Sequence, residues 1–345
     1  MTLRVTLAMS MIALPLATLA AGPAAGRTTG QSVEPPPLSL PVDCIMGRVC
    51  HIQNYVDQDP GPGRRDYACG RLSYDGHRGT DFRLPDYPAM RAGVDVVAAA
   101  PGRVLRVRDG VADVSIEITG GDAVKGREAG NGVVIDHGDG WHTQYSHLKR
   151  GTVAVRPGDA VATGDRLGQI GLSGKTEFPH LHFSVRHQGR DVDPFVGTGG
   201  FQGCEAPRAP LWSADTLAQL PYVATGLLVD GFAPSRPDKE AARQGTYGGM
   251  DLGSDPAALV YWVDLFGAMA GDRQRFRLTG PDGTALLDRT VTLEASNVSW
   301  FAFAGIRRPA DGWRPGPYTA RYTLERDGRV VVRAERETLA SPAGR

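Results

Sequence analysis

The sequence lacks an excess of charge of either sign, because 38 lysines and arginines among its 345 residues balance 38 aspartates and glutamates. A protein without net basic charge has no general electrostatic attraction for nucleic acid or for an anionic membrane surface. We therefore expect no nucleic-acid partner. The four cysteines contain no C-x2-C pair, which argues against a zinc site built from cysteines.

Long apolar runs are absent except at the start of the chain. Arg4 gives a short positive region, residues 5–21 are almost wholly apolar, and small residues follow. This pattern is typical of a secretory signal peptide, which we predict over residues 1–25. The alternative, an uncleaved anchor helix, is disfavoured because the run is short for a full span and contains Pro15. We expect an exported protein, periplasmic or extracellular, without a stable membrane span after signal cleavage.

Export to an oxidising compartment favours disulfides for the four cysteines, Cys44, Cys50, Cys69 and Cys204. Three pairings are open to them. We favour Cys50–Cys69, which closes a short Gly/Pro-rich loop. Cys44–Cys204 would then join the two ends of the first domain.

Glycine and proline are abundant, with 45 and 25 residues, and indicate many turns and short strands rather than long helices. The length of the chain favours two domains. We predict a mainly β fold with a Pro-rich leader over 26–41, a strand-and-turn domain over 42–205 and a second all-β domain over 211–340. Alternating segments at 132–136 and 152–155 are expected to be strands of the first domain.

The second predicted domain contains short β-type segments separated by turn dipeptides such as Asp327-Gly328. The candidate strands are 258–265, 273–279, 285–293, 300–304, 318–324 and 330–334. Strands at this spacing are typical of a small immunoglobulin-like sandwich. Since the domain has no histidine and no cluster of reactive residues, we expect it to bind a protein or cell-wall partner.

All eight histidines lie between His51 and His187. In His180-Leu-His182, the two imidazoles share one face of a strand, because side chains alternate along it. Leu181, Phe183 and Val185 then point to the opposite face and enter the core. Alternation likewise predicts that Trp141, Thr143, Tyr145 and His147 share one face of another strand. His137, His142 and His187 lie in or near turns, where we expect structural or solvated roles.

His77 and Asp81 are four residues apart and add one nitrogen and one oxygen ligand to this set. One carboxylate and two imidazoles suit Zn²⁺ and leave a fourth position open for water. A catalytic site needs that open position, so some of the histidines must lie beside the metal without binding it. Spacing alone does not decide which histidines are ligands.

The order of three motifs resembles the lysostaphin-type zinc peptidoglycan endopeptidases. These motifs are His77-x3-Asp81, the segment ending Tyr145-Ser-His-Leu148, and His180-Leu-His182. Turns at Pro157-Gly-Asp159 and Gly171-Leu-Ser-Gly174 also match the layout of the family. The resemblance covers about residues 75–185, a third of the chain.

The resemblance implies roles for five residues. His77, Asp81 and His182 would hold one zinc ion per chain, whereas His147 and His180 would be unligated catalytic histidines. One of these two would take a proton from water while the other stabilises the oxyanion or protonates the leaving amine. The resemblance does not decide which histidine has which role.

One departure from the family is Phe178, where a glycine is usual; it implies a differently shaped groove. The resemblance predicts an exported zinc-dependent metalloendopeptidase that hydrolyses peptidoglycan stem peptides or cross-bridges. An alternative is a non-catalytic zinc-fold regulator or cell-wall-binding module. A third is a secreted protease that cleaves Gly-rich proteins.

Overall fold

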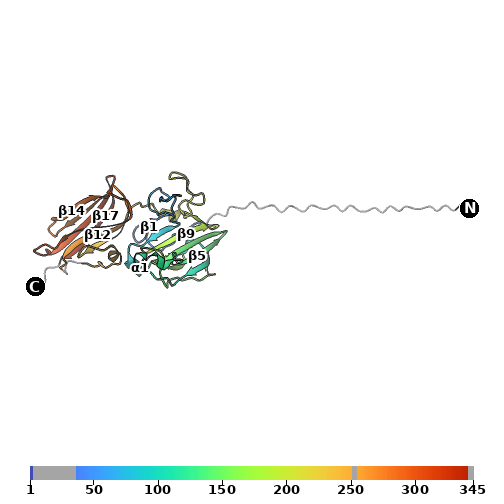
Figure 1. Ribbon diagram of the computed structural model, residues 1–345, viewed down its shortest axis with the longest axis horizontal. Helices are drawn as coiled ribbons and strands as arrows, with labels where there is room; N and C mark the ends of the chain where they lie inside the picture. Colours follow the sequence, from blue (N-terminus) through green and yellow to red (C-terminus); the bar gives the residue numbers. More distant parts are fainter. Residues whose placement is uncertain (3–35, 251–254, 341–345) are drawn as a thin grey trace. The chain divides into compact units, whose positions relative to one another are not determined.

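The computed structural model describes residues 1–2, 36–250 and 255–340 (Figure 1). Nearly all of the predicted signal peptide and the first part of the predicted leader lie outside the described residues. Over these ranges, no helix combines the length and the apolar character that crossing a bilayer requires.

Short strands dominate the first part of the described chain, as its glycine and proline content predicts. In chain order these strands are β1 (His51–Asn54), β2 (Thr80–Arg83), β3 (Asp95–Val97), β4 (Gly102–Arg108), β5 (Asn131–Gly138), β6 (Trp141–Leu148), β7 (Ala160–Val161), β8 (Arg166–Gln169), β9 (His180–His187) and β10 (Arg190–Val192). The helices here are α1 (Tyr87–Ala92), α2 (Ile116–Thr119) and the 3-10 turn η1 (Gly121–Val124). The segment 152–155, predicted as a strand, is not one.

These strands form an eight-stranded sheet in the order β1-β2-β9-β6-β5-β4-β7, with β10 paired to β9, and a separate β3-β8 pair. The pairs next to β9 are antiparallel and bring distant segments into register. Asp81 of β2 lies opposite His182, and Arg83 lies opposite His180. On the other side of β9, Ser146 of β6 lies opposite His182. The sheet therefore joins the predicted motifs at its centre.

Side chains of β9 alternate between the two faces of the sheet, as predicted. Leu181, Phe183 and Val185 are buried in a core cluster formed mainly by the first part of the described chain. Phe183 packs against Tyr145 of β6, with ring centroids 5.3 Å apart. Burial of an aliphatic or aromatic side chain of this size contributes about 1.5–3 kcal/mol to stability. The core face thus fixes the register of β9 and turns His180 and His182 to the other face.

The second part of the described chain is also built from strands. In chain order its elements are α3 (Ala214–Ala218), β11 (Gly226–Ala233), α4 (Lys239–Arg243), β12 (Ala258–Ala268), β13 (Arg273–Thr279), β14 (Ala285–Thr292), β15 (Asn297–Arg307), β16 (Gly316–Arg326) and β17 (Arg329–Ala340). They form a three-stranded sheet, β11-β12-β15, and a four-stranded sheet, β14-β13-β16-β17.

Buried side chains from both of these sheets form one core cluster, the arrangement of two sheets packed face to face. All six predicted strands are present, most of them with longer ends, and β11 was missed. The β16–β17 hairpin turns at Asp327-Gly328, whose φ angles of 50° and 75° suit the predicted turn. The immunoglobulin-like arrangement of the strands stays a prediction.

The predicted disulfide pairing was wrong. The bonds are Cys44–Cys50 and Cys69–Cys204, with Cα–Cα distances of 6.2 and 5.7 Å. A tight turn just before β1 brings Cys44 and Cys50 together. Within this turn the Gly47 amide donates to the Cys50 carbonyl at 2.7 Å. The second bond links positions 135 residues apart, whose approach depends on the folded sheet.

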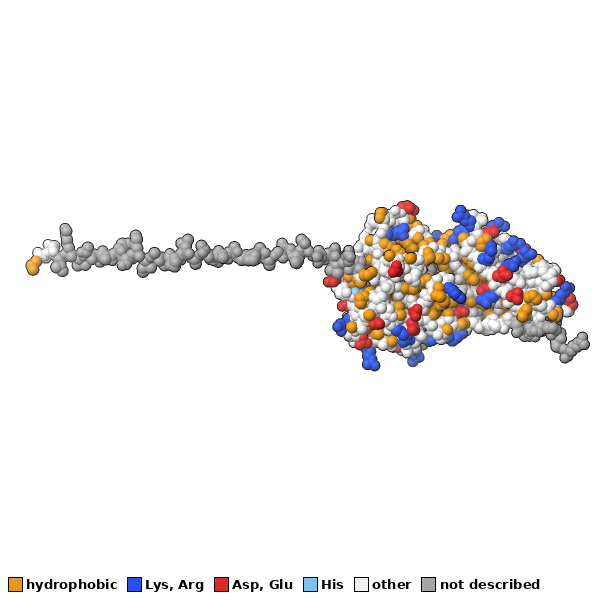
Figure 2. Space-filling view, turned by 180° about the vertical axis from the view of Figure 1, so that it is seen from behind, with side chains coloured by type: hydrophobic (Ala, Val, Ile, Leu, Met, Phe, Trp, Pro, Cys, Tyr) orange, Lys and Arg blue, Asp and Glu red, His pale blue; other side chains and the backbone are white. Residues whose placement is uncertain are grey.

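Two segments at the predicted domain edges pack into the first core. Leu38, within the predicted leader, and Trp212, within the predicted second domain, are both buried there. The Leu38 amide donates to the Leu211 carbonyl at 2.8 Å. On the face shown in Figure 2, acidic and basic side chains are interspersed, in keeping with the balanced charge of the chain.

Candidate metal centre and active site

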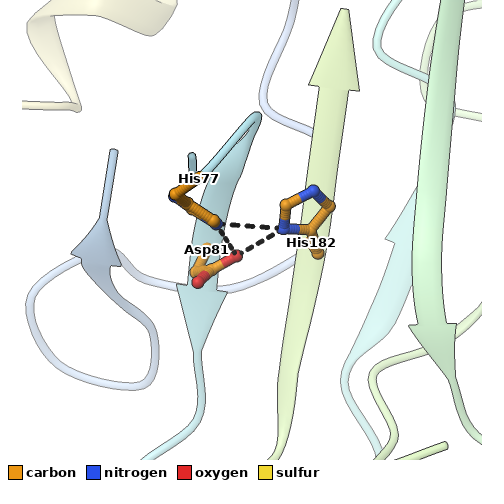
Figure 3. Close-up of side chains that lie close together, drawn as sticks. All are labelled: His77, Asp81 and His182. Atoms are coloured by element: carbon orange, nitrogen blue, oxygen red, sulfur yellow. Dashed lines mark hydrogen bonds and ion pairs between the residues drawn. The ribbon is translucent and has the colours of Figure 1, made fainter. Parts of the chain in front are cut away.

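Three of the predicted side chains converge at the β2–β9 pair. Asp81 extends from β2, His182 extends from β9, and His77 comes from the loop just before β2 (Figure 3). The Asp81 Oδ1 atom lies 3.1 Å from His77 Nε2 and 2.8 Å from His182 Nδ1. The two nitrogens are 3.2 Å apart. One atom from each residue therefore faces a common point, within 4.8 Å of the other two.

Hydrogen bonds outside this cluster determine which atoms face inward. His77 Nδ1 donates to the Tyr55 carbonyl at 2.7 Å, because a carbonyl only accepts, and Nε2 is therefore the atom that can lose its proton and bind a metal. The Ser184 hydroxyl lies 3.0 Å from His182 Nε2 and so leaves Nδ1 to face the cluster. The Tyr55 carbonyl thus selects the tautomer of His77 that a metal ligand needs, and the Ser184 contact orients the His182 ring.

Asp81 is oriented in the same way. The Asn54 amide donates to Oδ2 of Asp81 at 2.8 Å, which leaves Oδ1 for the cluster. Asn54 is buried, and its own Oδ1 has no hydrogen-bond partner among the described residues. It reaches Asp81 because the β1–β2 ladder shifts register between Ile52 and Asn54.

The local electrostatics favour a positive charge at the common point. Burial alone would lower the pKa of His77, but the charge of Asp81 and their hydrogen bond outweigh burial and raise it. Burial alone would raise the pKa of Asp81, but His77 and His180 hold it well below its usual range. Two nitrogens and one oxygen with converging lone pairs form a donor set suited to Zn²⁺.

His147 and His180 lie beside this cluster, with ring centroids 4.7 Å apart. His147 Nδ1 donates to the Ser173 carbonyl at 2.7 Å, and His180 Nδ1 donates to the Phe178 carbonyl at 2.9 Å. Each ring therefore presents an unprotonated Nε2, and that of His180 is 3.6 Å from Asp81 Oδ1. The structure brings together all five predicted site residues.

His147 reaches the site by a route that alternation did not predict. Trp141, Thr143 and Tyr145 share the buried core face of β6, and regular alternation would place His147 there too. The β5–β6 ladder instead contains a bulge, because Asn131 pairs with Leu148 while Val133 pairs with Tyr145. Within the bulge, His147 has a φ of 63°, and this left-handed conformation turns its ring to the site face.

Both of these histidines are poised as neutral bases. Burial, followed by the nearby His180 and His182, holds the pKa of His147 well below its usual value. Burial also lowers the pKa of His180, although the Asp81 carboxylate acts in the opposite direction. At neutral pH each Nε2 can accept a proton, as a general base must.

Sequence reasoning missed the residues that hold these side chains. Neither Asn54 nor Ser184 belongs to a motif that would have marked it as a support for the ligands. Gly79 is needed because a Cβ there would lie 2.6 Å from His182 Nε2. Thr176, whose hydroxyl lies 3.0 Å from His180 Nδ1, was also missed.

His137 and His187 have the structural or surface positions that were predicted. His137 Nδ1 donates to the Pro101 carbonyl at 2.7 Å, and its Nε2 lies 2.8 Å from the Thr143 hydroxyl. His187 stacks on Trp141 with ring centroids 4.2 Å apart.

Two cavities are lined in part by residues of the site. One, of about 810 Å³, includes His77 together with loop residues around Asp57, Asp191 and Asp193 in its lining. The other, of about 470 Å³, is called here the catalytic groove. It is lined by Gln53, Asn54, Arg64, Ser73, Tyr74, Asp81, Ile116, His147, Lys175, Thr176, Glu177, Phe178, His180, Val298 and Ser299.

Residues 75–194 match the family model described as Peptidase family M23, and this range contains all five site residues. Two similar proteins are the peptidoglycan DD-endopeptidases ShyB and ShyA of Vibrio cholerae. ShyB is 32% identical over 132 residues, which are 38% of this chain and 25% of ShyB. ShyA is 32% identical over 117 residues, which are 34% of this chain and 22% of ShyA.

Among solved structures, the catalytic domain of lysostaphin from Staphylococcus simulans is similar at 21% identity and a TM-score of 0.27. The match covers 41% of this chain and 85% of that domain. The chain spans about a quarter of the length of the curated relatives that it matches.

Proposed function

We propose that this chain is an exported zinc metalloendopeptidase of peptidase family M23, whose model matches residues 75–194, and that it hydrolyses peptide bonds in peptidoglycan stem peptides or cross-bridges. The observation that carries the proposal is the convergence of one oxygen and two nitrogens, each oriented by a hydrogen bond outside the cluster. The substrate class rests on the two relatives whose names specify peptidoglycan.

We assign His77, Asp81 and His182 as the ligands of one zinc ion per chain. When bound, zinc supplies a Lewis acid and makes a water molecule acidic enough to yield a nucleophile near neutral pH. His147 and His180 are the proton carriers of the proposed reaction, because each has a free Nε2 and a lowered pKa. One of them accepts the proton of the attacking water at its Nε2, and the other, once it has taken up a proton at Nε2, donates to the oxyanion or to the leaving amine.

Export is part of the proposal, with residues 1–25 as a cleaved signal peptide and the periplasm or cell exterior as the location. Two disulfides support an oxidising compartment. The immunoglobulin-like character of the second domain and its binding of a wall or protein partner are also proposed.

The function is tested by measuring zinc in the purified mature protein and analysing fragments released from defined peptidoglycans by mass spectrometry. We expect about one zinc per chain, and a chelator should abolish fragment release. A protein that holds stoichiometric zinc and releases no fragment from any peptidoglycan would instead be a regulator or a binding module.

The division of roles is tested with two substitutions. His182→Ala should remove both zinc and activity, because it deletes a ligand. His147→Ala should keep zinc while lowering kcat by about 10²–10⁴-fold, the usual contribution of a general acid or base. Equal loss of zinc in the two variants would contradict the assignment.

A further inference from the structure

The catalytic groove is lined in part by the second domain, although that domain carries none of the five site residues. Val298 and Ser299, at the start of β15, line the same 470 Å³ cavity as Asp81, His147 and His180. We propose that Val298 and Ser299 are specificity-determining residues, which limit the bulk of the peptide accepted on this side of the scissile bond. The inference rests on the proposed peptidase function and deepens it.

Val298 and Ser299 are called here the wall of the groove. A buried ionic cluster holds this wall in place. Asp264 of β12 accepts from Arg243 of α4 through Nε at 2.6 Å and through a terminal nitrogen at 3.2 Å. The same guanidinium donates to the Ser299 hydroxyl at 2.8 Å. Asp264 also lies 3.6 Å from the guanidinium of Arg83, which belongs to β2. One carboxylate therefore connects the wall to the sheet that carries the metal site.

Arg83 connects the cluster to the opposite side of the groove. It is fully buried, donates to Gln53 Oε1 and lies opposite His180 in the β2–β9 ladder. Its guanidinium lies 4.1 Å from the centroid of the Phe178 ring, a cation–π distance. Arg83 therefore contacts both Phe178 and the carboxylate that anchors the second-domain wall.

Further contacts between α4 and the first domain fix the same orientation. Tyr87 donates to Glu240 at 2.8 Å, and Arg91 donates to the Gln244 carbonyl at 3.0 Å. Lys239 pairs with Glu117 at 3.2 Å, but this pair is exposed and contributes little. Several polar contacts along one face therefore favour a fixed wall over a freely moving domain.

The size of the groove sets what the wall can discriminate. A cavity of about 470 Å³ is within the range of sites that enclose a small ligand. Val298 offers a small apolar surface and Ser299 a short polar one, and the exposed charged residues Lys175 and Glu177 line the same cavity. A peptide segment without a branch fits such a space better than a branched one.

The experiment uses the full-length zinc-loaded protein and two glycan-free substrates, a cross-linked dimer and a cross-linked trimer of stem peptides. Val298→Trp and Ser299→Trp fill the groove, whereas Val298→Ala widens it. Val291→Trp is the matched control, because Val291 is an exposed residue of β14 outside the groove. Zinc content is measured on every preparation.

We expect both groove-filling variants to lower the ratio of kcat/KM for trimer over dimer at least tenfold, since shape differences in a pocket discriminate about 10- to 200-fold. Val298→Ala should raise the ratio, and Val291→Trp should leave it within twofold. Ratios within twofold of the unsubstituted protein in all three groove variants would overturn the inference alone. Cleavage of neither substrate by the unsubstituted zinc-loaded chain would overturn the proposed function and this inference together.

Discussion

At the scale of single residues, the centre depends on side chains that hold the ligands rather than on the ligands alone. Asn54 donates to Asp81, Tyr55 accepts from His77 and Ser184 contacts His182. Such outer contacts orient the ligand side chains before a metal binds. Metal affinity should therefore respond to residues that never touch the ion.

Asn54→Ala should weaken zinc binding about 10–100-fold, because Asp81 loses the donor that directs Oδ1 to the cluster. Competition with a chromophoric chelator measures the affinity. Asn297→Ala is the control, since that amide only contacts the nearby Ala295 carbonyl. An unchanged affinity in Asn54→Ala would show that Asp81 needs no such support.

Asp193 makes stability depend on pH. Burial raises the pKa of this carboxyl to about 7, although the Phe195 amide and Gln58 favour its charged form. The unfolded chain releases the proton near pH 4, whereas the folded protein keeps it until about pH 7. Raising the pH between these values therefore favours unfolding, by an amount of the order of 4 kcal/mol for a three-unit shift.

Asp193→Asn should remove most of this loss of stability at higher pH. The variant keeps an oxygen for the Phe195 amide, and the Gln58 amide can rotate to face the new NH₂ group. We expect urea denaturation to show that the variant is more stable than the unsubstituted protein at pH 8. The free energy of unfolding should also depend less steeply on pH between pH 4 and 7. Asp191→Asn, at an exposed neighbour paired with Arg186, should keep the slope of the unsubstituted protein. A slope equally steep in Asp193→Asn would contradict the raised pKa.

At the scale of elements, the bulge in β6 decides whether the site is complete. Gly132 lies opposite the bulge, and a Cβ there would be 2.4 Å from the Tyr145 carbonyl oxygen. No side chain fits without moving β6, and His147 would move with it. The conformation of two paired strands thus controls one proton carrier.

Gly132→Ala should lower turnover at least tenfold and reduce stability by about 1–3 kcal/mol, the usual range for overpacking. Zinc content should stay the same, because the ligands lie on β2, β9 and the loop before β2. Steady-state kinetics and metal analysis check both points. The control is Gly199→Ala, where an added Cβ meets nothing within 4 Å. Full turnover in Gly132→Ala would show that the bulge tolerates strand movement.

At the scale of the whole molecule, the two predicted domains share a buried ionic cluster. Asp264, Arg83 and Arg243 are each at most 2% exposed. Removing one partner of a buried pair leaves an uncompensated charge, which costs about 3–5 kcal/mol. The cluster therefore specifies how the domains meet.

Asp264→Asn should lower the free energy of unfolding by about 3–5 kcal/mol, because two buried guanidinium groups lose their counter-ion. Urea denaturation measures the change. Asp288→Asn is the matched control, since Asp288 pairs with Arg275 on an exposed strand face and should have little effect. Similar stability of the two variants would indicate that the cluster is not closed in solution.

Much of the fold and of the candidate site could be predicted from the sequence alone. Composition indicated a mainly β chain, and alternation placed Leu181 and Phe183 in the core and both histidines of His180-Leu-His182 on the other face. Those inferences succeed because they depend on local periodicity and on ligand chemistry, which neighbouring residues determine.

Only the tertiary structure decided the features that join distant segments. The disulfide pairing was predicted wrongly because Cys69 and Cys204 meet only when the sheet is complete. The rotation of His147 depends on a bulge opposite Gly132, and the wall at Val298 depends on an aspartate 34 residues earlier in the chain. The ligand types of the zinc site are written in the sequence, whereas the atoms that face the ion are selected by hydrogen bonds that form only across the folded strands.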